Sequence, residues 1–173
     1  MNIAKNFIHA AFLFLTLTCL SIHLRAQSSG SDDKSGKVAA LRALVDSQAY
    51  VFIAQSATPL SGRVRPLTYD YSLTVSRTAI ICYLPYYGQS YTAPTDPTDD
   101  GLEFTSKKFN YRSTVRKKGG WEVTIKPKDQ GDIQQMYFVI TEDGYASLQV
   151  TSLNRQMISF TGYITAPQPK KSE

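Results

Sequence analysis

A tyrosine-rich stretch in the middle of the chain, "CYLPYYGQSYTAPTDPTDDG" (residues 82–101), holds the residue types that best suit ligand binding. Tyr86, Tyr87 and Tyr91 follow a predicted strand, next to a proline and a glycine. A tyrosine offers a large apolar face and a hydroxyl, so these rings could stack on a glycan or cover a small apolar ligand. The alternative is a compact loop that folds back and packs its rings on its own domain.

Acidic residues later in the same stretch raise the question of a metal site. Asp96, Asp99, Asp100 and Glu103 could supply oxygen ligands to Ca²⁺. Their spacing lacks the alternating acidic pattern of an EF-hand, and Asp, Pro and Gly are also what a turn requires. We therefore expect a turn, with no metal and no cofactor.

Paired carboxylates would be the simplest catalytic site that this chain could build. Asp70, Glu103 and Glu122 all fall on the polar phase of their predicted strands, so they should point to water. A catalytic acid is usually sheltered enough for its pKa to be raised. We expect no enzymatic activity, and a carboxylate hydrolase remains the alternative.

A cationic face is the third candidate site. Arg112 and Arg116 on one predicted strand and Lys126 on the next should all face outward. Such a face could meet an anionic glycan, a lipid headgroup or a protein partner in the cell envelope. Charges on the solvent side of a hairpin are also the default, and lysines protect sheet edges from unwanted pairing.

The first 26 residues resemble a secretory signal peptide. Lys5 lies in a basic start, the apolar run at 10–20 is too short to span a bilayer comfortably, and Ala26 suits a signal-peptidase cut. The alternative is a lipoprotein signal with Cys19 as the lipidated residue, although the residue before it is not the usual Gly, Ala or Ser. We expect an exported protein, periplasmic or associated with the outer membrane, whose mature chain has no transmembrane segment.

Cleavage after Ala26 would remove both histidines, His9 and His23, and leave Cys82 as the only thiol. Without histidine, no Ser-His-Asp or Cys-His site and no ordinary zinc or copper site can be built. Two of the 19 basic residues leave too, while all 14 acidic residues stay. The mature net charge of about +3 is too small to indicate a nucleic-acid partner. Cys82 alternates with apolar residues, which is typical of an inert core thiol.

The elements that would position these residues are one helix and a series of strands. Residues 27–36 are polar and predict a flexible tether, and apolar residues at helical spacing predict a helix from Ser35 to about Gln48. After Tyr50 the period changes to two, and residues 166–173 predict a disordered tail. We predict strands at 50–55, 67–76, 79–84, 102–106, 109–115, 121–127, 136–141, 145–151 and 157–165.

Two of these strands matter for the site. The strand at 67–76 should turn Leu67, Tyr69, Tyr71, Leu73 and Val75 inward, and the strand at 79–84 should be buried. Since no helix separates any two of the strands, which number about nine, the sheet must be antiparallel. Residues 37–165 therefore predict a single mainly β domain, an antiparallel β-barrel, with a β-sandwich as the alternative.

Four blocks of the sequence resemble domain-of-unknown-function family 4251, which is found in exported proteins of Gram-negative bacteria. They are "LVDSQAYVFIAQSATPLSGRVRPLTYDYSLTVS", "CYLPYYGQSYTAP", "FTSKKFNYRSTVRKKGGWEVTIKPKD" and "GYASLQVTSLNRQMISFTGYI". The resemblance runs from about Leu41 to Ile164 and implies a lipocalin-like barrel and no particular activity. Two hypotheses follow: a non-catalytic barrel that binds a small apolar or glycan ligand at one end, or an envelope interaction module that uses its outer surface.

Overall fold

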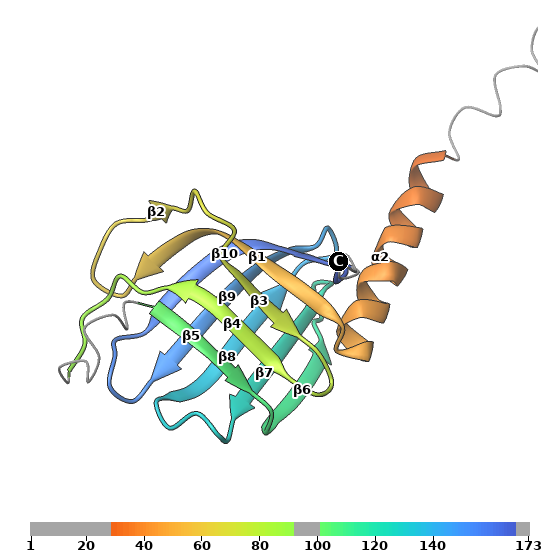
Figure 1. Ribbon diagram of the computed structural model, residues 1–173. Helices are drawn as coiled ribbons and strands as arrows, with labels where there is room; N and C mark the ends of the chain where they lie inside the picture. Colours follow the sequence, from red (N-terminus) through yellow and green to blue (C-terminus); the bar gives the residue numbers. More distant parts are fainter. Residues whose placement is uncertain (1–28, 92–100, 169–173) are drawn as a thin grey trace, which may run out of the picture. The chain divides into compact units, whose positions relative to one another are not determined.

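The structure, a computed structural model, describes residues 29–91 and 101–168 (Figure 1). The chain divides into two units, Met1–Gly36 and Lys37–Glu173. All of the strands lie in the second unit: β1 (Tyr50–Pro59), β2 (Arg65–Pro66), β3 (Ser72–Val75), β4 (Ile80–Pro85), β5 (Gly101–Ser106), β6 (Phe109–Val115), β7 (Trp121–Pro127), β8 (Ile133–Ile140), β9 (Tyr145–Ser152) and β10 (Ile158–Thr165). The predicted signal peptide, residues 1–26, lies outside the described residues.

Helix α2 (Ser29–Ser47) begins earlier than predicted. We expected it to start at Ser35, after a flexible tether, but residues 29–36 are helical as well. Adding a residue to a helix that already exists gains a hydrogen bond without a new nucleation cost, so polar residues can extend it. Composition alone therefore misplaced this boundary.

The last turns of α2 attach to the barrel through apolar side chains one helical turn apart. Leu41 and Val45 are buried in the common core. The helix ends at Ser47, and Gln48 follows with a φ of 55°, the left-handed conformation that commonly closes a helix. The chain then enters β1 directly.

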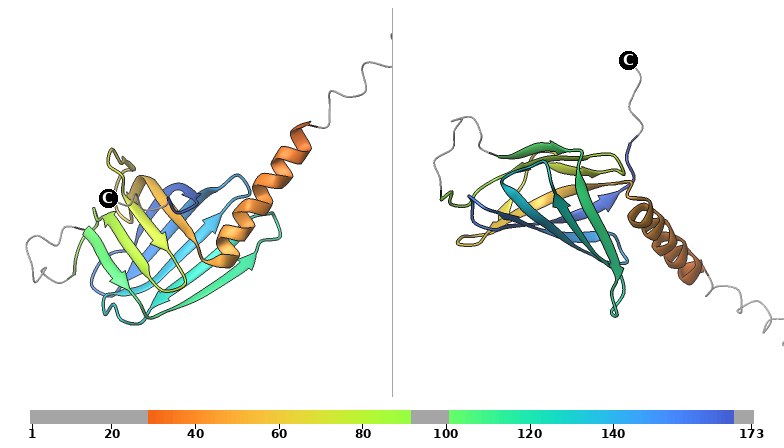
Figure 2. Two further views of the ribbon diagram at one scale, coloured as in Figure 1. Left: turned by 45° about the vertical axis from the view of Figure 1, so that its right-hand side comes forward. Right: turned by 90° about the horizontal axis from the view of Figure 1, so that it is seen from below.

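Nine strands form a nearly closed antiparallel barrel, so the prediction of a barrel is confirmed. Their order is β5-β4-β3-β1-β10-β9-β8-β7-β6, and the short β2 pairs with β1 beside β3. Two further views show these strands curling around a common interior (Figure 2). The strands β5 and β6 end the order, so the barrel has a seam between two strands that are adjacent in sequence.

The first and last strands pair closely at the middle of this order. Strand β1 runs antiparallel to β10 from Val51–Thr165 to Pro59–Ile158, with a bulge between Ala54 and Ser56. A Cβ on Gly162 would lie 1.9 Å from the carbonyl oxygen of Ile53. Only glycine allows the two backbones to approach this closely.

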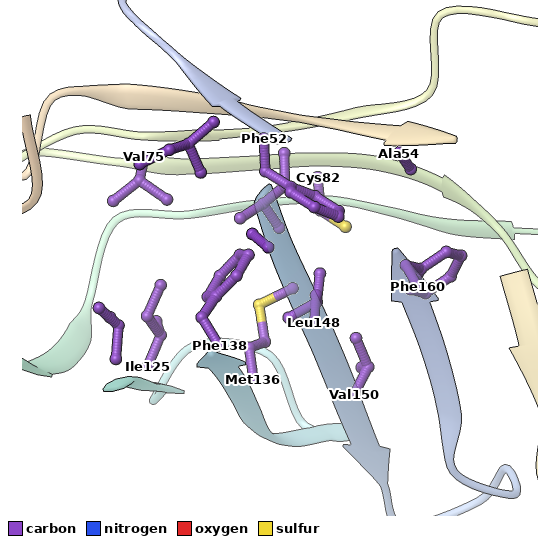
Figure 3. Close-up of a cluster of buried hydrophobic side chains, with 14 of the residues drawn as sticks. Phe52, Ala54, Val75, Cys82, Ile125, Met136, Phe138, Leu148, Val150 and Phe160 are labelled. Carbon is purple, nitrogen blue, oxygen red and sulfur yellow. The ribbon is translucent and has the colours of Figure 1, made fainter. Parts of the chain in front are cut away.

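Large apolar side chains fill the barrel interior. Phe52, Met136, Phe138, Leu148 and Phe160 are all buried and enter the interior from four strands, β1, β8, β9 and β10 (Figure 3). The Phe138 ring meets Phe52 edge to face, with 5.4 Å between centroids. As in other small barrels, side chains pack the interior to a solid core.

Cys82 lies in this core, as predicted, and burial raises the pKa of its thiol. Two other polar groups are buried there. Among the described residues, the Tyr50 hydroxyl and the Trp121 indole nitrogen have no hydrogen-bond partner. Burial, followed by the neighbouring Tyr111, raises the pKa of Tyr50 well above its ordinary value.

Two strand predictions were wrong in ways that change the outer surface. The strand expected at 67–76 is only β3, because the Tyr71 amide donates to the Tyr69 carbonyl (2.8 Å) in a tight turn that ends the alternation. Tyr69 is 73% exposed instead of facing inward. Strand β4 was expected to be buried, yet Ile81 and Tyr83 are exposed on its outer face. An apolar residue type does not by itself place a side chain inside a sheet.

Candidate functional site

The loop after β4 is attached to the β9–β10 turn through Tyr86. The Tyr86 hydroxyl lies 2.9 Å from the Gln89 carbonyl oxygen and 2.8 Å from the Gln156 carbonyl oxygen. The Arg155 guanidinium lies over the ring, 5.3 Å from its centroid. Burial raises the pKa of Tyr86, and Arg155 partly opposes this. The Tyr86 ring therefore holds the loop in place, which is the alternative that the sequence left open.

Tyr91 lies on the same side of the loop as Tyr86. Its amide donates to the Asn154 carbonyl (2.7 Å), and its side chain is 68% exposed. The residues that follow it, with the predicted acidic turn at Asp96, Asp99 and Asp100, lie outside the described residues. Within residues 29–91 and 101–168, no three His, Cys, Asp or Glu side chains gather where they could hold a metal.

Tyr87 turns to a different neighbourhood, where it lies near the exposed rings of Tyr69 and Tyr83 and the half-buried ring of Tyr71. The Arg65 guanidinium lies 4.9 Å from the centroid of the Tyr87 ring. Tyr71 stacks on Tyr83, with 5.4 Å between centroids and 28° between planes. Tyr69 meets Tyr71 edge to face at 6.1 Å. We call Arg65, Tyr69, Tyr71, Tyr83 and Tyr87 the tyrosine surface.

Electrostatic coupling connects the members of the tyrosine surface. Loss of solvent raises the pKa of Tyr71, and Tyr87, Tyr83 and Tyr69 raise it further. Glu103 on β5, which lies opposite Tyr83 in the β4–β5 register, also contributes. The tyrosine surface therefore spans β2, the turn before β3, the outer face of β4 and the loop after β4, with a carboxylate at its margin.

Only one of the three tyrosines predicted to bind a ligand, Tyr87, belongs to the tyrosine surface. Sequence reasoning missed Tyr69 and Tyr71 because it assigned both to the core face of a longer strand; this placement was wrong for Tyr69, whereas Tyr71 does pack against the core while its ring stacks on Tyr83. It missed Tyr83 because the strand containing it was expected to be buried. The pairing of β3 with β4 could have revealed the cluster, since Tyr83 lies opposite Ser72 and therefore near Tyr71.

The predicted cationic face lies on the outside of β6 and β7. Arg112 and Lys126 are exposed, and Arg112 lies opposite Thr124 in the register. Arg116 forms an ion pair with Glu122, with 3.4 Å between Nε and Oε1. This pair neutralises one of the three cations, and it also occupies one of the carboxylates considered for catalysis.

The remaining carboxylates of that set, Asp70 and Glu103, are exposed on the surface. The only thiol of the second unit, Cys82, is buried with a raised pKa, which makes it a poor nucleophile at neutral pH. In the described part of the chain, no helix is long and apolar enough to cross a membrane.

Comparison with known proteins identifies a family but no activity. A family model described as "Domain of unknown function (DUF4251)" matches residues 32–164. The fold resembles the crystal structure of a DUF4251 family protein from Bacteroides eggerthii, with 15% sequence identity, a TM-score of 0.52, and coverage of 77% of this chain and 87% of that chain. At this identity the likeness concerns the fold alone. No curated protein matches the chain.

Proposed function

The chain belongs to the DUF4251 family, whose β-barrel domain has no known function, and on this premise we propose that it is an exported, non-catalytic protein that binds a glycan at the tyrosine surface. The observation that carries the proposal is the stacked pair Tyr71–Tyr83, flanked by two more tyrosines on the outside of the barrel. Tyr69 and Tyr83 leave 73% and 47% of their area exposed. Large aromatic side chains gathered in one exposed patch often mark a binding site.

The chemistry of the patch suits a sugar ring. An aromatic face can pack against the apolar C–H face of a sugar, while nearby polar groups bind its hydroxyls. The phenol groups can donate or accept hydrogen bonds, the Arg65 guanidinium can donate, and the Glu103 carboxylate can accept. The tyrosine surface thus combines stacking faces with donors and acceptors at its margin.

The packed interior supports a site on the outside of the barrel. Phe52, Phe138 and Phe160 have no exposed area and occupy the space that an internal ligand would need (Figure 3). We therefore propose that the ligand binds on the outside of the barrel, at β4, the turn before β3 and the loop after β4, in place of the barrel end expected from the sequence. Tyr86 and Tyr91 stay outside this proposal, since Tyr86 holds the loop through its own hydrogen bonds.

Binding to an array of neutral and acidic oligosaccharides, followed by calorimetry on the best ligand, would test this function. Replacement of Tyr69 or Tyr83 by alanine should weaken binding about five- to tenfold, since an aromatic contact contributes about 1 kcal/mol. Tyr145→Ala is the matched control, because Tyr145 is also exposed (64%) but lies on β9. Equal losses in the control and the test variants, or no glycan bound by the wild type, would refute the proposal.

Export is part of the proposed function and has its own test. Purification from the native host followed by N-terminal sequencing should give a chain that starts at Gln27. A lipidated chain would instead begin at Cys19 and partition into detergent. An unprocessed chain that still begins at Met1 in the cytoplasm would contradict export.

A further inference from the structure

We propose that a pocket beside the C-terminus of α2 binds the phosphate or sulfate group of a small, ring-containing ester. This inference does not depend on the proposed function, because none of the pocket residues belongs to the tyrosine surface. The pocket has a volume of about 460 Å³ and is lined by Gln48, Arg77, Lys107, Lys108, Phe109, Tyr111 and Lys128. This volume falls in the range of ordinary small-molecule sites.

Several parts of the barrel bring these side chains together. Arg77 comes from the β3–β4 turn, Lys107 and Lys108 form the β5–β6 turn, and Lys128 follows β7. Figure 1 shows the end of β5, the start of β6 and the β3–β4 turn at one end of the barrel. Cations that are far apart in sequence therefore converge at the end of the β5–β6 seam.

The three lysines of the pocket, Lys107, Lys108 and Lys128, form no ion pair with any carboxylate within residues 29–91 and 101–168. Four like charges around one hollow raise the local potential and favour a multiply charged anion. The negative end of the α2 dipole lies nearby and opposes this effect. However, the Arg77 Nε donates a hydrogen bond to the Ser47 carbonyl (3.0 Å). This carbonyl is one of those that create the negative end of the helix dipole, so the bond weakens the opposing effect.

The Asp129 carboxylate fixes the β5–β6 turn through hydrogen bonds to the backbone. It therefore leaves the side-chain charges of Lys107 and Lys108 in place. Asp129 accepts hydrogen bonds from the backbone amides of Lys107 (2.8 Å) and Lys108 (3.0 Å). Its other oxygen accepts from the Ser106 hydroxyl at 2.5 Å. These bonds, led by the one from Ser106, hold the pKa of Asp129 below its usual value. The backbone of the turn is therefore fixed, while both lysine side chains remain exposed to a ligand.

The other wall of the pocket is aromatic, which is why we infer a ligand with a ring. Phe109 and Tyr111 lie side by side on β6 and are half-buried. The Tyr111 hydroxyl donates to the Val45 carbonyl (3.0 Å), and this bond fixes the orientation of the ring. A bare phosphate would leave much of the pocket empty, whereas a hexose phosphate could place its ring on the aromatic wall and its charge among the lysines.

Amide chemical shifts of the full mature chain, measured at constant ionic strength, would test the pocket. We expect saturable shifts at residues 105–111 and at Arg77 with a hexose phosphate, weaker binding of inorganic phosphate, and no binding of the neutral hexose. The double variant Lys107→Gln/Lys128→Gln should weaken binding at least about tenfold, because a hydrogen bond to a charged group is worth about 1.5–3 kcal/mol.

The matched control is Lys117→Gln/Lys118→Gln, which removes the same charge from the exposed β6–β7 turn. An equal loss in both double variants would show a non-specific charge effect and overturn the site.

Equal affinity for the neutral hexose would overturn the role of the anion, and equal affinity for inorganic phosphate would overturn the role of the ring. Binding only to phosphatidylglycerol vesicles, and to no soluble phosphate, would replace the small ester by a lipid headgroup and refute the proposal as stated. Tyr83→Ala should leave phosphate binding unchanged, which separates this site from the proposed glycan site.

Discussion

Replacement of Gly162 by alanine is the sharpest test of how the first and last strands pair. An added Cβ would lie 1.9 Å from the carbonyl oxygen of Ile53, 2.9 Å from its carbonyl carbon and 3.1 Å from the Cα of Ala54, whereas ordinary contact begins at 3.4 Å. All three are backbone atoms, so no change of rotamer can relieve the overlap. Relief requires β1 and β10 to separate locally by about 1.5 Å, which is a case of overpacking.

The cost of this separation follows from what it breaks. A hydrogen bond between β1 and β10 that is lengthened by about 1.5 Å is lost. Each lost bond costs about 1 kcal/mol of stability. Overpacking adds about 1–3 kcal/mol. We expect Gly162→Ala to lower the free energy of unfolding by about 2–4 kcal/mol. A domain of this size is stable by about 5–15 kcal/mol, so the variant should still fold.

Urea unfolding followed by tryptophan fluorescence measures this change directly. Trp121 is the only tryptophan of the chain and is 4% exposed, so its emission should shift on unfolding. Gly131→Ala is the matched control, because nothing lies within 4 Å of an added Cβ there. We expect the control to stay within about 0.5 kcal/mol of the wild type. If Gly162→Ala behaves like the control, the described β1–β10 register is wrong.

Three further predictions concern single side chains. The pKa of Asp129 is lowered mainly by the Ser106 hydroxyl, so its stabilising effect should be complete above about pH 4 and disappear as the pH falls through the lowered value. The stability difference between wild type and Asp129→Asn should therefore shrink on acidification, and a constant or growing difference would contradict this. Cys82 should react with a thiol reagent only after unfolding in urea, because burial raises the pKa of the thiol; fast labelling of the native protein would argue against the core placement. Tyr86→Phe should destabilise the domain by about 1 kcal/mol and speed hydrogen exchange at Gln156, whereas unchanged exchange would mean that the hydroxyl does not hold the loop.

Two strands in the second half of the barrel could be read from the sequence almost residue by residue, whereas β8 (Ile133–Ile140) starts and ends earlier than the predicted 136–141. Strands β6 and β7 begin and end where predicted, and Trp121, Val123 and Ile125 all face the core. Strand β7 follows the turn at Gly119 and Gly120 and alternates strictly between apolar and polar residues. In such a strand local pattern and tertiary burial agree, so the pattern is sufficient.

The first half was harder because its local pattern continues past the end of the strand. Tyr69 and Tyr71 keep the period of two, yet the hydrogen bond between their backbones turns the chain before β3 starts. The polar residues before Ser35 carried no helix signal, but the helix extends through them. Both errors arise from interactions that composition and period do not encode.

The two proposed sites were beyond sequence reasoning for a different reason. Arg77, Lys107 and Lys128 share a pocket only because three turns meet at one barrel end. Arg65 and Tyr87 also come together only in the folded barrel, since they lie on opposite sides of β3 in the sequence. The cationic residues singled out on β6 and β7 were correctly turned outward, but the structure pairs Arg116 with Glu122.

The position of β1 between β3 and β10 also has a kinetic consequence. Strands β6–β10 are each paired with a sequence neighbour, as are β3–β5, so both groups can form from strands that follow one another along the chain. The pairing of β1 with β10 joins distant parts of the chain, as in the contact between the Ser56 and Thr161 hydroxyls across 105 positions. Closing so long a loop costs entropy before any contact repays it, which slows folding. Docking of β1 onto β10 is therefore the step expected to limit the folding rate.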